Sequence, residues 1–148
     1  MNSMFVCKRF QELSLEELYE ILHLRSAVFV VEQDAVYQDL DDLDQDALHL
    51  RLYKDGRLAA YARILKAGTY LDEVAIGRVI AVERGVGDGL AIFTKAIQIA
   101  QAEFGAERIK IRAQLQAKGF YEKTGVRCCG EPFMYEGLVH VDMMWSKE

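Results

Sequence analysis

Three glycines and an arginine fall within the segment Arg-Gly-Val-Gly-Asp-Gly at 84–89, between two apolar stretches. The stretch before it, ending at Val82, is typical of a buried strand, and the stretch from Leu90 onward is typical of a helix. A glycine-rich turn that leads from a strand into a helix exposes successive backbone N–H groups at the positive end of the helix dipole. Residues 84–89 are therefore interpreted as a loop that binds phosphate.

Two common kinds of phosphate-binding loop do not fit this segment. A nucleoside-triphosphate loop needs Lys and then Ser or Thr after its last glycine, whereas Gly89 is followed by Leu90 and Ala91. The dinucleotide fingerprint needs a third glycine at a fixed position, and no glycine stands there in this segment. The strands before the loop also form a hairpin meander, which differs from the βαβ unit of that fingerprint.

The elements that must position this loop alternate between strands and helices. Ser14 and Glu17 have the spacing of a capping box at the start of the first helix, and Asp55-Gly56 predicts a β-hairpin. We expect strands at 4–10, 48–53, 58–65, 74–82, 108–113, 126–130 and 138–145, and helices at 14–29, 87–104 and 115–125.

This order predicts an α/β (α+β) fold with a mixed, mostly antiparallel sheet and helices on both faces. The strand that ends at Val82 and the strand that starts at Arg108 flank a crossover helix, so they should be parallel neighbours in the middle of the sheet. At 148 residues, with 51% hydrophobic residues, the chain is expected to be one domain, residues 1–148.

Composition also limits the partners and the compartment. A net charge of -5 with scattered Lys and Arg gives no electrostatic footprint for nucleic acid. The apolar runs are too short to span a bilayer, and the first ten residues lack the apolar core of a signal peptide, so we expect a cytoplasmic protein that does not bind membranes. The three cysteines have no C-x-x-C spacing and are interpreted as structural or incidental thiols.

The loop resembles the pyrophosphate loop of the GNAT N-acetyltransferases, whose pattern is Gln or Arg, two residues, Gly, one residue, and Gly or Ala. The expected strand order is also similar to that family, as is the sequence FYEKTGV at 120–126, which resembles F-Y-x-x-x-G-F. More narrowly, RSAVFVVEQ, YQDLDD, AYARIL and IGRVIA resemble the small bacterial ElaA-type branch. One position departs from the pattern: Asp88 stands where the family usually has an apolar residue, so its side chain must point away or coenzyme affinity must fall.

This resemblance implies acyl transfer from acetyl-CoA to an amine, without a metal. The loop would hold the pyrophosphate, and the main chain of 77–82 would run beside the pantetheine arm, with an amide near Val79 or Ile80 donating to the thioester oxygen. The residues that the resemblance assigns to the coenzyme are Val79, Ile80, Ala81, Val82, Arg84, Gly85, Val86, Gly87, Asp88, Gly89, Leu90, Gln114, Phe120 and Tyr121.

Two side-chain roles remain in such a reaction, an acid for the departing thiolate and a base for the ammonium. Tyr121 falls at the family's tyrosine position and is the expected acid, with packing as a core aromatic as its alternative. Glu32 and His140 compete for the role of base, since imidazole is a side chain suited to proton transfer near neutral pH and Glu32 follows the helix where substrate enters in the family. A structural histidine is the alternative for His140.

Residues on the acceptor side are expected to include Phe29, Glu32, Arg63, Arg78 and His140. Arg63 and Arg78 interrupt apolar strands, so they either form a cationic patch for a substrate carboxylate or a coenzyme oxygen, or pair with Glu32 or the acidic segment 39–46. That segment lacks the Gly and the Glu that an EF-hand requires, so it is interpreted as a solvated face or a lid over the acceptor entrance.

The sequence thus predicts an acetyl-CoA-dependent N-acetyltransferase that works by direct attack in a ternary complex on a small-molecule or peptide amine. A non-catalytic acyl-CoA-binding or regulatory module with the same fold is the alternative, and a structural protein without a ligand is the third. A homodimer would be ordinary for the family.

Overall fold

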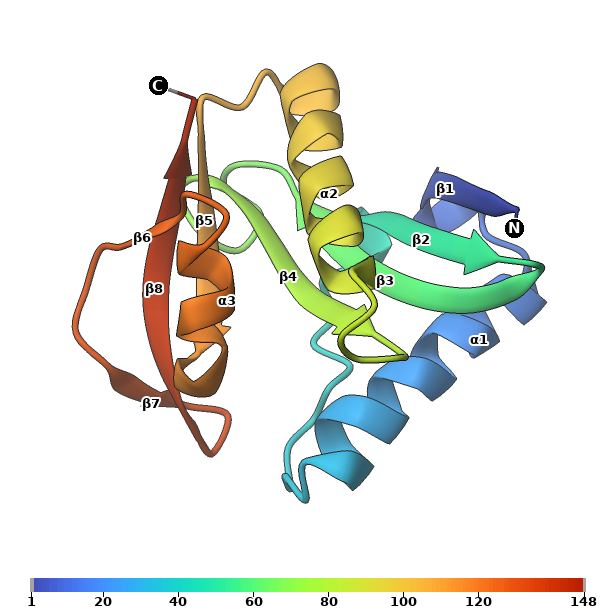
Figure 1. The fold of residues 1–148 in the computed structure, drawn as a ribbon, viewed down its shortest axis with the longest axis horizontal. Helices are drawn as coiled ribbons and strands as arrows, with labels where there is room; N and C mark the ends of the chain where they lie inside the picture. Colours follow the sequence, from blue (N-terminus) through green and yellow to red (C-terminus); the bar gives the residue numbers. More distant parts are fainter. Residues whose placement is uncertain (1, 148) are drawn as a thin grey trace.

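A mixed eight-stranded sheet organises residues 2–147, the part of the chain that the computed structural model describes (Figure 1). Its strands run in the order β1-β2-β3-β4-β5-β8-β6, and β7 pairs with β8. Every pair is antiparallel except β4 with β5. The strands are β1 (Ser3–Arg9), β2 (Leu48–Lys54), β3 (Arg57–Leu65), β4 (Val74–Ala81), β5 (Arg108–Gln114), β6 (Arg127–Cys128), β7 (Phe133–Tyr135) and β8 (Leu138–Ser146).

Helices connect these strands. The side chain of Ser14 accepts a hydrogen bond from the N–H of Glu17, and the Glu17 carboxylate accepts one from Ser14 N–H, which confirms the predicted capping box. The helix predicted at 14–29 divides into an α-helix and a π-helical continuation. The helices are α1 (Leu15–Arg25), η2 (the π-helical Ser26–Glu32), α2 (Asp88–Phe104) and α3 (Lys118–Glu122), with 3-10 turns at Phe10–Glu12, Asp44–Asp46 and Leu115–Ala117.

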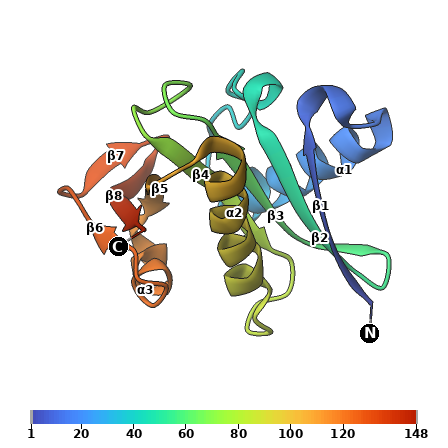
Figure 2. The same ribbon diagram turned by 90° about the horizontal axis from the view of Figure 1, so that it is seen from above.

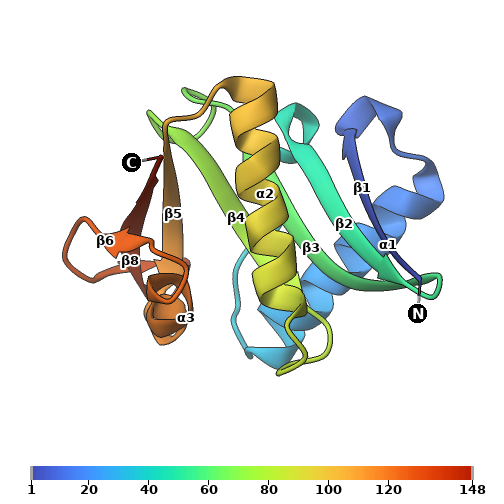
Figure 3. The ribbon, with the colours of Figure 1, turned by 45° about the horizontal axis from the view of Figure 1, so that its top comes forward.

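The two faces of the sheet bury different kinds of residue. Helix α2 covers the face formed by β2, β3 and β4, where Ile92 and Phe93 are fully buried against apolar residues such as Leu50. Helix α1 lies on the opposite face (Figures 2 and 3). Polar residues are buried there beside apolar ones such as Ile21, and Arg51 pairs with Glu17 of α1. The main apolar core therefore lies on the α2 side.

The parallel pair separates soon after it forms. Only Val74 with Ile109 and Ala75 with Lys110 are paired, after which β4 and β5 diverge (Figure 3). A bulge falls on the diverging part of β4, where Arg78 has a φ of 52°. Beyond Ala75, the edge of β4 that faces β5 thus has no strand partner in the described chain.

The predicted fold class is confirmed: the sheet is mixed and mostly antiparallel, with its parallel pair where expected. The strand expected at 126–130 is wrong in length, because only Arg127–Cys128 pairs with β8, and the short β7 was not predicted. Cys7, Cys128 and Cys129 are free thiols. None of the helices in residues 2–147 has the length and apolar character needed to cross a membrane.

Candidate active site

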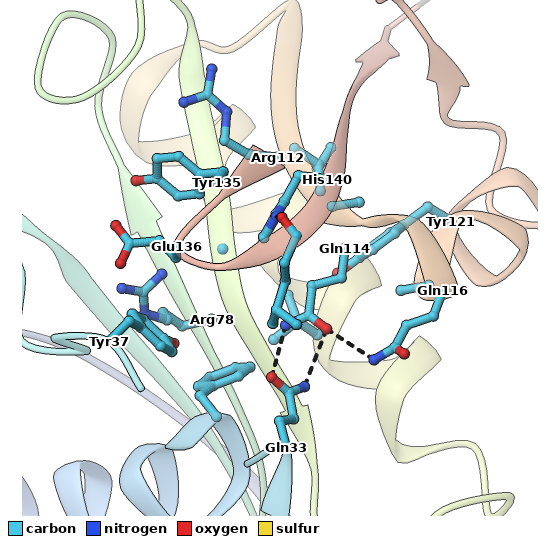
Figure 4. Close-up of a pocket in the computed structure, with 17 residues that line it drawn as sticks. Gln33, Tyr37, Arg78, Arg112, Gln114, Gln116, Tyr121, Tyr135, Glu136 and His140 are labelled. Carbon is cyan, nitrogen blue, oxygen red and sulfur yellow. Dashed lines mark hydrogen bonds between the residues drawn. The ribbon is translucent and has the colours of Figure 1, made fainter. Parts of the chain in front are cut away.

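A cavity of about 170 Å³ lies where β4 and β5 diverge (Figure 4). Its walls come from η2, β4, β5, α3 and the β7–β8 hairpin, so segments far apart in sequence meet there. Of the residues assigned to the site from sequence, it is lined by Phe29, Arg78, Val79, Gln114, Tyr121 and His140.

The glycine-rich loop forms the turn between β4 and α2. Gly85 and Gly87 adopt φ angles of 80° and 89°, which side chains disfavour, so glycine is needed there. No side chain caps α2, and its first hydrogen bond joins Ala91 N–H to Gly87 O at 3.0 Å. The N–H groups of Asp88, Gly89 and Leu90 therefore have no partner within residues 2–147 and are available to an anion.

The structure explains how an acidic residue, Asp88, can stand at a loop position where the family usually has an apolar one. Lys54, the last residue of β2, places its Nζ 3.1 Å from each carboxylate oxygen of Asp88. Asp88 is buried, with 7% of its surface exposed. Its charge is thus compensated by a lysine from another strand and also lies in the first turn of α2, where the helix dipole favours an anion.

Arg84, the first residue of the loop pattern, pairs with Glu32 at the end of η2. Both side chains are exposed, and Glu32 does not line the cavity. The structure therefore brings Glu32 to the glycine-rich loop instead of bringing it to His140.

Tyr121 lies in α3 against an aromatic cluster. Its ring meets those of Phe93 and Phe120 edge to face, with centroids 5.1 Å apart in each case. The hydroxyl forms no hydrogen bond with residues 2–147, and burial raises the pKa of this phenol. Tyr121 thus packs as a core residue and also lines the cavity as a neutral proton donor.

His140, on β8, enters the cavity from the opposite wall to β4 (Figure 4). Its Nδ1 is 2.9 Å from the carbonyl oxygen of Leu138, which can only accept a hydrogen bond. In the neutral ring Nδ1 must therefore carry the hydrogen, which leaves the lone pair on Nε2. Nε2 has no hydrogen-bond partner in the described chain, so it is free to take a proton.

A chain of amide side chains crosses the gap between η2 and β5 (Figure 4). Gln33 and Gln114 exchange two hydrogen bonds of 3.2 and 3.0 Å, and Gln116 donates to Gln114 at 2.9 Å. Gln114 was expected to contact the coenzyme, but Gln33 and Gln116 were not predicted, because the contacts of this chain of amides join residues far apart in the sequence.

The two strand arginines pair with the acidic segment, one of the alternatives weighed from sequence. Arg63 binds Asp41 and Asp44, and Arg78 binds Asp39 and Asp41. Arg63 is 3% exposed and has its Nη groups occupied, so it offers no open cationic patch. Neither arginine pairs with Glu32.

The interpretation of the acidic segment as a solvated face is wrong for Asp39 and Asp44, whereas its role as a lid over the acceptor entrance stays a prediction. Asp39 and Asp44 are 7% and 6% exposed, and both also bind the fully buried Arg25. Burial alone would raise the pKa of Asp44, but hydrogen bonds and charges from Arg25 and Arg63 outweigh it and lower that pKa.

A second arginine of the cavity, Arg112 on β5, was not predicted. It makes a bidentate pair with Asp142 at 2.8 and 3.1 Å and donates to the hydroxyl of Tyr70. The rings of Phe133 and Tyr135 lie within 5.1 Å of its guanidinium carbon. No sequence pattern signals this cluster, because β5, β7 and β8 meet only in the folded sheet.

The remaining residues assigned to the coenzyme lie outside the cavity lining, along β4, in the glycine-rich loop, in the first turn of α2 and, for Phe120, in α3. They are Ile80, Ala81, Val82, Arg84, Gly85, Val86, Gly87, Asp88, Gly89, Leu90 and Phe120. Phe120 is close to the loop, since a Cβ added to Gly89 would lie 3.7 Å from its ring. Residues 2–147 contain no group of three His, Cys, Asp or Glu side chains arranged to hold a metal ion.

Comparison with known proteins adds independent findings. Residues 9–147 match the acetyltransferase (GNAT) domain family. The chain is 39% identical over 136 residues to the ElaA protein of Escherichia coli K12, covering 89% of each. The crystal structure of E. coli ElaA matches with a TM-score of 0.87 at 35% identity, covering 97% of this chain and 99% of that one. An acyl-CoA N-acyltransferase from Pseudomonas aeruginosa matches with a TM-score of 0.88 at 34% identity, over the same shares of the two chains.

Proposed function

The chain belongs to the GNAT acetyltransferase family and to its ElaA-type branch, and on that premise we propose that it transfers an acetyl group from acetyl-CoA to an amine by direct attack in a ternary complex. One observation carries the proposal. The divergence of β4 from β5 opens a cavity beside a free strand edge and lines it with a neutral phenol and an imidazole, Tyr121 and His140.

The chain offers two sets of main-chain groups to acetyl-CoA. The N–H groups of Asp88, Gly89 and Leu90 would bind its pyrophosphate at the start of α2. The free edge of β4 from Gly77 to Ala81 would pair with the amides of the pantetheine arm, as an added strand does at a sheet edge. Acetyl-CoA supplies the acetyl thioester, and the N–H of Val79 or Ile80 would donate to the thioester oxygen.

His140 and Tyr121 take the two proton-transfer roles in this proposal. His140 Nε2, left with its lone pair by the Nδ1 contact, accepts the proton of the ammonium acceptor. The Tyr121 hydroxyl, kept protonated by burial, donates a proton to the departing sulfur. Glu32 is the weaker candidate for the base, because it pairs with Arg84 outside the cavity.

Thiol release from acetyl-CoA in the presence of a panel of amines tests this function. Turnover with at least one amine, together with mass spectrometry of the acetylated product, would support it. Binding of acetyl-CoA without turnover of any amine would favour a non-catalytic acyl-CoA-binding module, and a lack of binding by calorimetry would overturn both.

A further inference from the structure

The charges around the cavity are almost all compensated. Of the ionised side chains that line it, Arg78 is paired with Asp39 and Asp41, and Arg112 is paired with Asp142. Because Asp39 and Asp41 also bind other arginines, the balance of charge extends over a whole cluster. That cluster joins three arginines to three aspartates, namely Arg25, Arg63, Arg78, Asp39, Asp41 and Asp44.

Glu136 is the exception. It lines the cavity, yet it forms no ion pair or hydrogen bond with any residue of the described chain. In Figure 4 its carboxylate lies on the same side of the cavity as Arg78, Tyr37 and Tyr135. The Glu136 residue is exposed. Because Arg78 is already paired with Asp39 and Asp41, the charges around the cavity leave one net negative charge at Glu136.

The two tyrosines beside Glu136 add no charge of their own. Burial raises the pKa of Tyr37 to about 12 and also raises the pKa of Tyr135, so both are neutral phenols near pH 7. Arginines already lie over their rings, since the guanidinium carbons of Arg78 and Arg112 are 5.9 and 5.1 Å from the ring centroids of Tyr37 and Tyr135. The carboxylate of Glu136 is therefore the group on this wall that is left to bind an ammonium.

The backbone at Glu136 is unusual for a glutamate. Glu136 and Gly137 form the two-residue turn between β7 and β8, with φ angles of 55° and 78°. Such turns favour Asn or Asp followed by Gly, as in the other tight hairpin of this chain, where Asp55 and Gly56 adopt φ angles of 51° and 79°. A longer side chain in this strained position gains nothing for the turn itself, which points to a use for its carboxylate.

We propose that Glu136 selects acceptors that carry a second positive charge, as in a diamine, and holds the distal ammonium at its carboxylate while the other amine reacts. This substrate class rests on the proposed acetyl transfer. Acceptors with a carboxylate at the distal end are disfavoured, because Glu136 repels them and both cavity arginines are already paired.

Three amines of equal chain length separate these cases: 1,4-diaminobutane, butylamine and 4-aminobutyrate, which end in ammonium, methyl and carboxylate. We expect kcat/KM for the diamine to exceed that for butylamine by about tenfold, with aminobutyrate the poorest. In Glu136→Gln the diamine should lose most of this advantage, while butylamine changes little. Glu131→Gln, an exposed glutamate outside the cavity, is the matched control and should change nothing.

Glu136→Asn separates the charge from the turn, since Asn suits the positive φ but removes the carboxylate. It should fold at least as stably as the parent and lose the diamine preference in the same way. Equal kcat/KM for the three amines, or a diamine preference that survives both variants, would overturn the assignment.

Calorimetric binding of the same three amines to the protein with CoA makes the test independent of turnover. Diamine binding that depends on Glu136 without acetylation would keep this inference and refute the proposed acetyl transfer. Diamine binding no tighter than that of butylamine would refute this inference, whether or not acetylation occurs.

Discussion

Lys54 Nζ lies 3.1 Å from both carboxylate oxygens of Asp88, so an acid in the first turn of α2 has its counter-ion on a neighbouring strand. Lys54→Met should leave that buried carboxylate uncompensated beside the phosphate loop and weaken acetyl-CoA binding by about tenfold. Asp88→Val should leave affinity equal or improve it, and the double variant should recover most of the loss. Calorimetry at two salt concentrations measures all three. A marked loss in Asp88→Val would show that the carboxylate itself assists binding.

Gly89 tests the phosphate loop because the fold has room for a side chain there, whereas a bound pyrophosphate would not tolerate a charged one. A Cβ there would lie 3.7 Å from the Phe120 ring and 3.8 Å from the Ala81 Cβ, which are ordinary contacts, so Gly89→Ala should fold normally. Gly89→Glu should also fold but abolish acetyl-CoA binding, since its carboxylate would face the pyrophosphate. Thermal unfolding and calorimetry of both variants provide the readouts. If the affinity of Gly89→Glu for acetyl-CoA is unchanged, the pyrophosphate binds somewhere other than this loop.

The sequence was informative where chemistry is local. The capping box at Ser14, the Asp55-Gly56 hairpin and the turn into α2 are each encoded within a few residues, and all three are present. The bulge at Arg78 and the pairing partner of Asp88 could not be read, because they depend on which strands become neighbours. The same limit hid the amide chain of Gln33 and the cluster around Arg112.

The acidic segment shows a different limit. A run of aspartates resembles a solvated face, and only the tertiary fold places Asp39 and Asp44 against buried arginines. Sequence pattern gives the charge of a residue but does not give its counter-ion. The burial of these aspartates becomes predictable only once the arginines of α1, β3 and β4 are known to face the segment.

Stability should fall in acid, and Glu17 should account for part of the loss. Hydrogen bonds from the Ser14 N–H and from Arg51 lower the pKa of Glu17 from its ordinary 4.5 to about 2. A carboxylate with a depressed folded-state pKa stabilises the fold fully above its unfolded pKa, and this contribution disappears as pH falls toward the folded value. The free energy of unfolding of the parent, measured with urea, should therefore fall as the pH is lowered from about 5 to about 2.

Glu17→Gln should remove this part of the pH dependence. It costs about 1–3 kcal/mol near neutral pH, because the fully buried Arg51 loses its counter-ion. The difference between variant and parent should shrink at pH 2. Glu16→Gln, on the exposed side of the same helix turn, is the control and should follow the parent. A difference that stays constant with pH would exclude the charge of Glu17 as its cause.

His140 and Glu32 make opposite predictions as the candidate base. His140→Gln should lower kcat by about 10²-fold with little change in acetyl-CoA affinity, because it removes the lone pair on Nε2. Glu32→Gln should leave kcat within about twofold and affect acetyl-CoA affinity instead, since Glu32 contacts Arg84 of the loop. Steady-state kinetics on one amine decide between them. The reverse pattern would assign the base to Glu32.

Tyr121→Phe removes only the hydroxyl and keeps the ring that packs against Phe93 and Phe120. The fold and the acetyl-CoA affinity should therefore be preserved. Turnover should fall by about 10²-fold, the lower end of the range for general acids, because a thiol is a good leaving group and water can replace part of the proton donation.

A variant that removes the whole aromatic ring is the matched comparison for this prediction. Tyr121→Leu should lose both the proton donor and the aromatic packing, so its melting temperature should fall along with its turnover. In Tyr121→Phe the two effects separate, since the melting temperature stays and kcat drops while KM for acetyl-CoA is unchanged. If turnover of Tyr121→Phe stays within about twofold of the parent, the hydroxyl takes no part in the chemistry and Tyr121 serves only the core.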